Sequence, residues 1–453
     1  MDKNEILAIL KDWNDWEGQQ DVGIIRGVYL DRLEALIAGS NQIITITGPR
    51  RAGKSYLMRQ MTRRLSDKGV KRENILFVNF EDPRFTALDT KLLAQVYDVY
   101  KGFLSPTDMP YIFLDEIQEV AGWEKWVRAM HELRKAKIIV SGSNAHLLSR
   151  ELGTLLTGRH LDFTVFPLSF TEYLLFNKVE VKKAFDIVGN EAEIDGLLHK
   201  YMEAGSFPEV ALSVKKREIL LNYFDDLLTK DLLKRFRVRK APAMKALIKY
   251  YLSNAANLVT FTSAGKSLQV HTNTIERFSG YFEDVYLIFL LKRFSYKVKE
   301  QEKSPRKIYC VDTGLCNSFG FRFSENIGRL AENIVFLALK RKQILDPQVE
   351  LFYWKDIQHR EVDFVIKHGL KPTSAIQVCW NIRDEKTKSR ELRSLHKGMK
   401  DLNITDATII TEQVEGEEKL NGYTVKMVPL RKWLLAEESL PAVETGTIGS
   451  NDS

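Results

Sequence analysis

The first half of the chain alternates short β-branched or apolar runs with segments whose apolar residues recur at helical spacing. The runs at 43–47, 75–80, 111–114 and 137–140 are typical of buried strands. Helical spacing predicts helices at 24–35, 56–65, 88–104 and 123–135. Because strands and helices alternate over about 130 residues, we expect an α/β unit with a parallel sheet.

The pattern changes in the second half. Residues 170–258 are almost entirely helical in pattern, and 259–310 follow as a helix, a turn, a helix and two short extended segments. A helix from residue 330 precedes strands at 351–354, 361–366 and 375–379, a helix at 392–402 and strands at 407–411 and 424–428, which predicts a second α/β unit. Residues 437–453 are small, polar and acidic, as in a disordered tail. The predicted divisions are 1–20 (an N-terminal helix), 21–168, 169–255, 256–310, 311–436 and 437–453.

Charge is distributed unevenly over the 453 residues. The 67 Lys and Arg against 60 Asp and Glu give a net charge of +7. Residues 1–200 carry −1 (27 basic, 28 acidic), residues 201–400 carry +14 (36 and 22), and residues 401–453 carry −6 (4 and 10). The basic middle suggests contact with a polyanion, although basic residues also simply solvate helices.

The remaining composition argues for a cytoplasmic protein with folded cores. Hydrophobic residues make up 44% of the chain, which excludes wholesale disorder. No run approaches the roughly 20 apolar residues of a membrane span, and the N-terminus lacks a secretory pattern. The three cysteines lack CxxC spacing, so we expect neither a disulfide framework nor a zinc site.

A glycine-rich motif follows the first predicted strand and opens the next predicted helix. GPRRAGKS matches GxxxxGK[ST], in which backbone N–H groups and a helix N-terminus surround phosphate groups. Lys54 would reach the β- and γ-phosphates of ATP, and the Ser55 hydroxyl would bind Mg²⁺. The predicted nucleotide-binding residues are Gly48, Pro49, Arg50, Arg51, Ala52, Gly53, Lys54, Ser55 and Tyr56.

Polar residues at the ends of two later strands complete this site. The apolar run 111–114 ends at Asp115 and Glu116; we expect Asp115 to hold Mg²⁺ and Glu116 to polarise the attacking water. The next strand ends in SGSN, where Ser143 either senses the γ-phosphate or simply forms a turn. Beyond it, Arg150 and Arg159 are candidates for an arginine finger acting in a neighbouring subunit, or for surface ion pairs.

These motifs together resemble a known family, the prokaryotic and especially archaeal AAA+-type ATPases related to STAND NTPases that carry a C-terminal restriction-endonuclease-like domain. Besides GPRRAGKS, the shared motifs are FLDEIQ, SGSNAHLLS, LTGRHLDFTVFPLSFTEYL, EAGSFPEV, KIYCVDTGL, GRLAENIVFLALKR and REVDFVI. The resemblance implies a P-loop AAA+ core at 21–168, a helical lid at 169–255, a winged-helix module at 256–310 and a nuclease-like α/β domain at 311–436. It also favours Arg159 as the arginine acting in trans.

The winged-helix segment offers residues suited to DNA. Helices at 262–268 and 272–284 have helix-turn-helix spacing, with His271, Asn273, Thr274 and Arg277 as candidate contacts on the second. Residues 292–307, with seven basic and two acidic residues, suit a β-hairpin wing that touches phosphates. Residues 230–240 add six basic residues against one acidic. The alternative is a winged helix used only for oligomer contacts.

The nuclease-like segment departs from an active site. Glu332, Asp363 and Gln377 echo an E…D…(E/Q)xK pattern, in which carboxylates hold Mg²⁺. Gln377 supplies no anion, and the lysine position is Cys379. Lys340 or Lys367 are candidate replacements for the lysine, but we favour a degenerate fold used for binding or assembly.

The sequence therefore predicts a Mg²⁺-dependent ATPase that couples hydrolysis to DNA binding, acting as a homo-oligomer. The alternatives are a STAND-like assembly switch that uses no nucleic acid, and an ATP-regulated nuclease.

Overall fold

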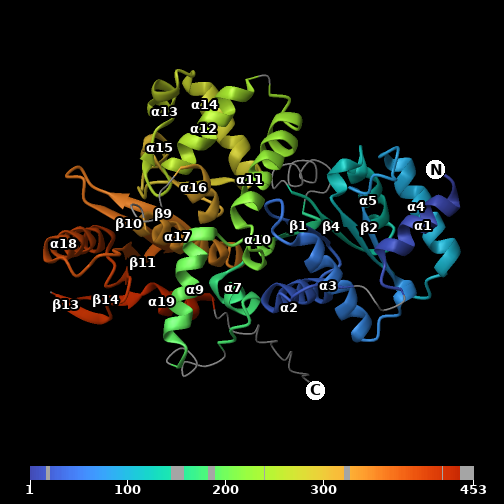
Figure 1. Cartoon of the computed structure of the whole chain (residues 1–453), viewed down its shortest axis with the longest axis horizontal. Helices are drawn as coiled ribbons and strands as arrows, with labels where there is room; N and C mark the ends of the chain where they lie inside the picture. Colours follow the sequence, from blue (N-terminus) through green and yellow to red (C-terminus); the bar gives the residue numbers. More distant parts are fainter. Residues whose placement is uncertain are drawn as a thin grey trace, which may run out of the picture.

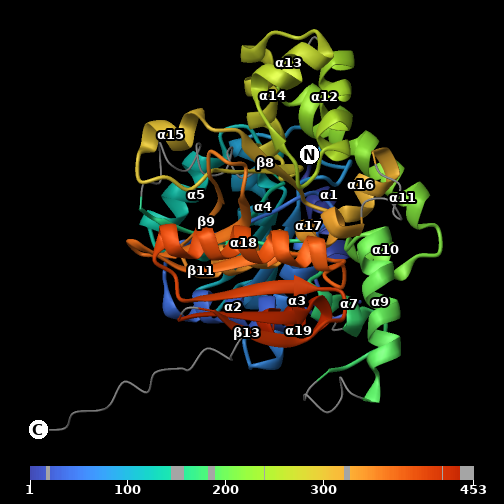
Figure 2. The same cartoon turned by 90° about the vertical axis from the view of Figure 1, so that its left-hand side faces the viewer.

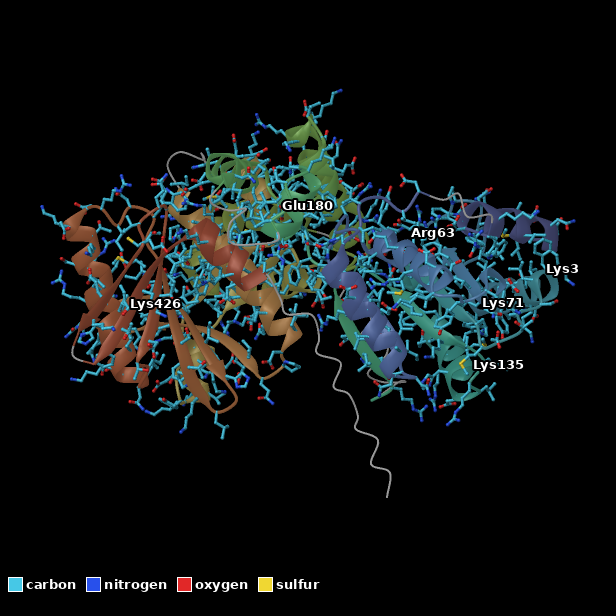
Figure 3. All side chains as sticks on the ribbon, turned by 90° about the horizontal axis from the view of Figure 1, so that it is seen from below. Lys3, Arg63, Lys71, Lys135, Glu180 and Lys426 are labelled. Atoms are coloured by element: carbon cyan, nitrogen blue, oxygen red, sulfur yellow. The ribbon has the colours of Figure 1, made fainter. Side chains whose placement is uncertain are left out.

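The computed structural model describes residues 1–16, 21–143, 158–181, 189–238, 240–320, 327–420 and 422–438. An N-terminal α/β unit lies at one end of the long axis and a C-terminal sheet at the other, with helices between and above them (Figure 1). In Figure 3, Lys3 on α1 (Lys3–Trp13) and Lys426 on β14 (Tyr423–Pro429) mark the two ends. No helix among the described residues is long and apolar enough to cross a membrane.

The N-terminal unit is built on five parallel strands in the order β2-β3-β4-β1-β5. Their bounds are β1 (Ile43–Thr47), β2 (Ile75–Asn79), β3 (Tyr111–Asp115), β4 (Lys137–Ser141) and β5 (His160–Thr164). The first four confirm the predicted parallel sheet. The edge strand β5 was missed because its sequence, HLDFT, is apolar at only two of its five positions.

Side chains that alternate along these strands bury against helices on both faces. Ile44 and Ile46 pack with α2 (Gly27–Gly39) and α3 (Lys54–Asp67), whereas Ile43, Ile112 and Leu114 pack with the opposite layer. That layer contains α1, α4 (Thr90–Leu104) and α5 (Trp123–Glu132), and two short 3₁₀ turns, η1 (Arg72–Asn74) and η2 (Ile117–Glu119), join the elements. The chemistry-bearing loops therefore emerge at one edge of a sheet held rigid on both faces.

The middle of the chain is helical, as predicted. Its first part comprises α7 (Phe170–Phe176), α9 (Glu191–Ala204), α10 (Pro208–Leu212), α11 (Lys216–Asp226), the π-helix η3 (Leu227–Lys234) and α12 (Ala241–Ser253). Next come α13 (Phe261–Leu268) and α14 (Thr272–Asp284), with a three-stranded antiparallel sheet of β6 (Leu258–Val259), β8 (Arg306–Cys310) and β7 (Ile288–Leu291). In Figure 2, α12, α13 and α14 project beyond the rest of the molecule.

The predicted β-hairpin wing at 292–307 needs correction. β7 ends at Leu291 and β8 begins at Arg306, and the connection holds a short helix, α15 (Val298–Lys303). Its sequence, VKEQEK, has no alternating apolar residues, and Lys, Glu and Gln are good helix formers. Glu302 pairs with Lys292 and Arg306, so acidic residues of the segment neutralise part of its basic charge.

The C-terminal unit is a six-stranded mixed sheet in the order β13-β14-β12-β11-β10-β9. Its elements are α16 (Thr313–Phe319), α17 (Ile327–Leu345), β9 (Val349–Lys355), β10 (Glu361–His368), β11 (Lys371–Val378), α18 (Glu385–Leu402), β12 (Asp406–Thr411), β13 (Gly416–Leu420), β14 and α19 (Leu430–Glu438). The strand β13 was missed, because GEEKL is charged and pairs only with β14 at the edge.

The last helix, α19, returns to the middle of the molecule and packs on α7 and α17 (Figure 1). The Thr171 backbone N–H donates to Glu438 Oε2 at 3.0 Å, and the Glu438 side chain is only 6% exposed beside Arg341. Glu437 and Glu438 therefore belong to this helix rather than to the predicted tail, because they face basic partners, Lys342 and Arg341. The rest of that tail, 439–453, lies outside the described residues.

Two sequence motifs interlock where the middle and C-terminal segments meet. The buried Asp312, just after β8, accepts hydrogen bonds from Ser206 N at 2.6 Å, Ser206 Oγ at 3.1 Å and Leu315 N at 3.1 Å. A Cβ atom on Gly205, whose φ is +83°, would lie 2.1 Å from Asp312 Oδ1. EAGSFPEV and VDTGL thus form one close contact, which also fixes the start of α10.

Candidate active site

The loop between β1 and α3 has the backbone of a phosphate-binding loop. Gly48 has a φ of +138°, and a Cβ there would lie 2.0 Å from the Val165 carbonyl oxygen. Gly53, with φ +95°, immediately precedes α3, so the free N–H groups at this helix end face the loop. Only glycine meets both demands without strain.

Lys54, the first residue of α3, turns back over this loop. Its side chain is 4% exposed, and its Nζ donates to the carbonyl oxygens of Gly48 and Pro49, both at 3.1 Å. Glu116 Oε1 lies 3.8 Å from the same nitrogen. A buried ammonium held by loop carbonyls and a carboxylate is well placed to transfer these contacts to phosphate oxygens.

Asp115 ends β3 with one oxygen free. Ser141 Oγ donates to Asp115 Oδ1, whereas the buried Oδ2 has no hydrogen-bond partner among the described residues. The pKa of Asp115 is raised to about 6, chiefly by burial and also by the adjacent Glu116, although the hydroxyls of Ser141 and Ser55 oppose the rise. An unpartnered carboxylate oxygen with a hydroxyl near it fits a hard cation, so Asp115 and Ser55 would hold Mg²⁺.

Glu116 is held beside the loop in the left-handed region, with φ +52°. Its backbone N–H donates to Ser141 Oγ at 3.0 Å, and Gln118 donates to its carboxylate. Burial raises the pKa of Glu116, but Lys54 and the hydrogen bond from Gln118 outweigh it, and the net direction is down. The carboxylate therefore stays ionised, as a group that polarises water must be.

A buried network that sequence reasoning missed joins the loop to the π-helix η3. Asp231 Oδ2 accepts from Arg50 Nε at 3.2 Å, and Arg235 lies 3.6 Å from Asp231 Oδ1. Ser143, 1% exposed, lies between them, with Arg235 donating to its Oγ at 3.3 Å. Arg235 is thus held inside by Asp231 and Ser143, whereas the other described basic residues of 230–240, namely Lys230, Lys234, Arg237 and Lys240, are exposed. The signal available was an Asp and an Arg four residues apart in a basic run.

A cavity of about 820 Å³ opens beside the loop. Lys54, Ser55 and Glu116 line its phosphate end. Its remaining wall combines charged residues with apolar and aromatic ones, on which a purine base could stack. These further lining residues include Ile24, Tyr56, Phe176, Pro208, Leu212 and Tyr223. Arg51 stacks over Tyr223 with 5.3 Å from its guanidinium carbon to the ring centre.

Arg26 supports the loop from below and was also missed by sequence reasoning. Its side chain donates to the Ala52 carbonyl at 2.8 Å, to the Phe166 carbonyl at 3.0 Å and to both carboxylate oxygens of Glu172 at 2.7 Å. Arg26 and Glu172 are 3% and 9% exposed, so this bidentate pair is desolvated. The nucleotide loop is thereby tied to α7.

The arginine candidate Arg159 lies apart from this site. Arg159 precedes β5, level with the start of β1, since its carbonyl accepts from Ile43 N at 3.1 Å. Its side chain is 44% exposed and pairs with Glu132. It therefore lies at the start of the strands, whereas the phosphate-binding loop follows the end of β1. Arg150 and Asn144 lie outside the described residues.

The helix pair α13 and α14 presents polar residues outward. His271, Asn273, Glu276 and Arg277 are exposed, and Thr274 is half-buried. Ile275, Phe278 and Phe282 of α14 face inward. Gln269, in the left-handed region at φ +54°, makes the turn between the helices.

The predicted nuclease-like residues do come together, around a cation that the sequence did not point to. Lys307 Nζ lies 2.8 Å from Glu332 Oε1, 2.8 Å from Glu361 Oε1 and 2.7 Å from Asp363 Oδ1. Burial, together with Asp363, raises the pKa of Glu332 to about 8. Burial lowers the pKa of Lys307, but Asp363 and Glu332 reverse this, and the net direction is strongly up.

The other residues considered for this cluster have separate partners. Gln377 Oε1 accepts from Asp363 N at 3.1 Å, and its Nε2 donates to Glu391 at 2.9 Å. Lys340 donates to Gln343, and Lys367 pairs with Glu350. Over the described part of the chain, no group of three or more His, Cys, Asp or Glu side chains is arranged to hold a metal ion.

Family models match three successive parts of the chain. Residues 40–174 match the family described as an AAA domain. Residues 195–325 and 327–433 match two domains of unknown function, DUF8612 and DUF4143.

Relatives extend over most of the chain. Uncharacterized protein MJ1544 of Methanocaldococcus jannaschii is 35% identical over 410 residues, which cover 87% of this chain and 88% of that protein. An uncharacterized protein of Haemophilus influenzae is 28% identical, and the match covers 83% of this chain and 92% of that protein. Among solved structures, the Walker-type ATPase paby2304 of Pyrococcus abyssi is 12% identical, covers 66% of this chain and 96% of its own, and has a TM-score of 0.42.

Proposed function

The chain belongs to the family of AAA-domain proteins that includes MJ1544, and on that premise we propose that it is a Mg²⁺-dependent ATP hydrolase whose nucleotide state is coupled to DNA binding. The observation that carries the ATPase proposal is the unpartnered Asp115 Oδ2, buried beside Ser55 and next to the Lys54–Glu116 pair. Of these groups, Lys54, Ser55 and Glu116 line the phosphate end of a cavity large enough for a nucleotide.

Each residue then has one role in hydrolysis. Ser55 and Asp115 would hold Mg²⁺, which would supply Lewis-acid stabilisation of the charge that develops on the phosphates. Lys54 would leave the loop carbonyls to contact the phosphates. Glu116, kept ionised by Lys54, orients the attacking water and accepts its proton. Arg50 lines the same cavity and would be free to contact a phosphate once released from Asp231.

Replacing Lys54 tests nucleotide binding. Lys54→Ala removes the only ammonium at the loop carbonyls among the described residues, so we expect fluorescent ATP to bind at least about 100-fold more weakly. Lys68→Ala, at the other end of α3 and paired with Glu34, is the matched control and should bind as the wild type does. Wild-type affinity in Lys54→Ala would contradict the assignment of this cavity.

We propose that α13 and α14 form the helix-turn-helix of a winged-helix module that binds duplex DNA. Supporting this are the exposed Asn273 and Arg277 on α14, the exposed Lys266 on α13, and the projection of both helices in Figure 2. The net charge of +14 on residues 201–400 favours the phosphate backbone as partner.

Salt dependence tests this proposal. Fluorescence anisotropy with random duplex DNA at several salt concentrations should give a negative log–log slope, and Arg277→Ala should reduce its magnitude by about 1. Lys426→Ala, on β14 at the far end of the molecule, should leave the slope unchanged (Figure 3). No binding at low salt would refute DNA as the partner.

One observation favours the alternative of a nucleotide-controlled assembly switch. Asp231 ties the π-helix to Arg50 of the loop, so a nucleotide that takes over Arg50 would release the helical lid. We also propose a homo-oligomer. Arg159 lies at the end of the strands opposite the phosphate-binding loop and does not line the cavity of its own chain, so as an arginine finger it would act in a neighbouring subunit. Light scattering measures the molar mass with and without ATP. A mass that changes with ATP is expected for the assembly switch, and a monomeric mass under both conditions would exclude the switch and the homo-oligomer.

A further inference from the structure

A lysine from the middle of the chain is the centre of the carboxylate cluster in the C-terminal unit. Lys307 belongs to β8, whereas Glu332 belongs to α17, and Glu361 and Asp363 belong to β10. All three carboxylates lie within 2.8 Å of its Nζ, and the lysine is 3% exposed. The three donor positions of one ammonium are therefore matched by three acidic side chains from two separate elements.

Each of the three carboxylates also has a partner besides Lys307. Glu332 Oε1 also accepts from Tyr309 at 2.6 Å, Glu361 Oε2 pairs with Lys355 at 2.9 Å, and Asp363 Oδ2 accepts from Val378 N at 2.9 Å. Gln377 stands where an active nuclease-like site would have a second acid. Its amide oxygen accepts from Asp363 N, and its amide nitrogen donates to Glu391.

A divalent ion does not fit this arrangement. Mg²⁺ requires near-octahedral oxygens at about 2.0–2.1 Å, with several waters retained. Lys307 Nζ occupies the position between the carboxylates instead, 2.7–2.8 Å from an oxygen of each. A metal could enter only by displacing Lys307 from all three carboxylates.

We propose that the Lys307 ammonium is the resident cation of this cluster in place of a metal ion, and that it fastens β8 to the C-terminal sheet. The same strand is fixed at its other end, where Asn333 exchanges two hydrogen bonds with the Cys310 backbone at 2.8 and 2.9 Å. Asp312 follows directly and holds Ser206, two residues before Pro208 in the wall of the nucleotide cavity. The cluster thus anchors the strand that supports one side of that cavity.

Metal binding without nucleotide tests the proposal independently of ATPase activity. Calorimetric titration with Mn²⁺ should give the same result for wild-type protein and for Asp363→Asn, because any weak binding at Ser55 and Asp115 is common to both. Lys307→Ala should lower Tm by at least ~5 °C, because it leaves buried carboxylates uncompensated. Mn²⁺ should then bind this variant and restore part of the Tm, and Lys307→Ala/Asp363→Asn should lose that gain.

Two results would overturn the proposal. One is Mn²⁺ binding to the wild type that disappears in Asp363→Asn, since a metal would then be the resident cation. The other is a Lys307→Ala protein with an unchanged Tm, since the lysine would then fasten nothing. If Lys307→Ala does not fold, the wild-type and Asp363→Asn titrations still decide between lysine and metal.

Discussion

Replacing Glu116 by Gln separates ATP hydrolysis from ATP binding. The amide keeps the shape of the side chain in its buried position but cannot accept the proton of the attacking water. Removing a general base of this kind costs about 10²–10⁴-fold in rate, so we expect kcat to fall by that factor. Steady-state phosphate release gives kcat, and Glu119→Gln, an exposed residue three positions on, is the matched control.

The same substitution should tighten ATP binding, and the structure gives the size of the effect. Glu116 Oε1 lies 3.8 Å from Lys54 Nζ, a separation at which unit charges interact by about 4 kcal/mol at an effective dielectric constant of about 20. At about twice that distance, repulsion between the carboxylate and a phosphate charge is about 2 kcal/mol, or roughly 30-fold in Kd. Fluorescent ATP binding gives Kd. A kcat within threefold of wild type would refute the role of Glu116, and binding weakened tenfold would refute the charge argument.

Two further predictions concern buried acids. Because the folded-state pKa of Asp115 is raised to about 6 from 3.8, its stability cost is absent below about pH 4 and grows as pH rises to 6. Without Mg²⁺ or nucleotide, Asp115→Asn should therefore be more stable than wild type by roughly 1–3 kcal/mol at pH 7.5 and equally stable near pH 4. Thermal unfolding at both pH values measures this difference. A variant less stable than wild type at pH 7.5 would contradict the prediction. Asp231→Asn removes a negative charge beside Arg50 and Arg235, so fluorescent ATP should bind about tenfold more tightly. The control Asp225→Asn, at an exposed position, should bind ATP as the wild type does. Weaker binding by Asp231→Asn would show instead that Asp231 holds the arginines in the position that ATP binding requires.

The nucleotide-binding core could be predicted from sequence because its signals are local. β-branched runs form the buried parallel strands, and the glycines of GPRRAGKS meet backbone demands that other residues do not. The structure brings Lys54, Ser55 and Glu116 to one cavity because strands β1 and β3 end at the same edge of the sheet. Short polar strands such as β5 and β13 carry no comparable pattern, since their pairing depends on distant neighbours.

Residues that act across long sequence separations could not be found in this way. Lys307 was counted in a basic run for the wing, yet its three partners lie 25 to 56 residues further on. Arg235 was counted with surface charges, yet the π-helix turns it toward Ser143, 92 residues earlier. Net charge describes how many cations a segment has, but burial and pairing decide which of them can meet a polyanion.

The packing of α19 on α7 has a consequence for how the protein is made. The contact from Thr171 to Glu438 joins residues 267 positions apart, and α19 is the last described helix to be synthesised. The interface around Arg341 thus stays open until α19 is synthesised, with α7 and α17 lacking that cover. Assembly of the three units should therefore be a late, slow step governed by long-range closure. A ribosome stalled before codon 430 would expose an apolar surface that the finished chain hides.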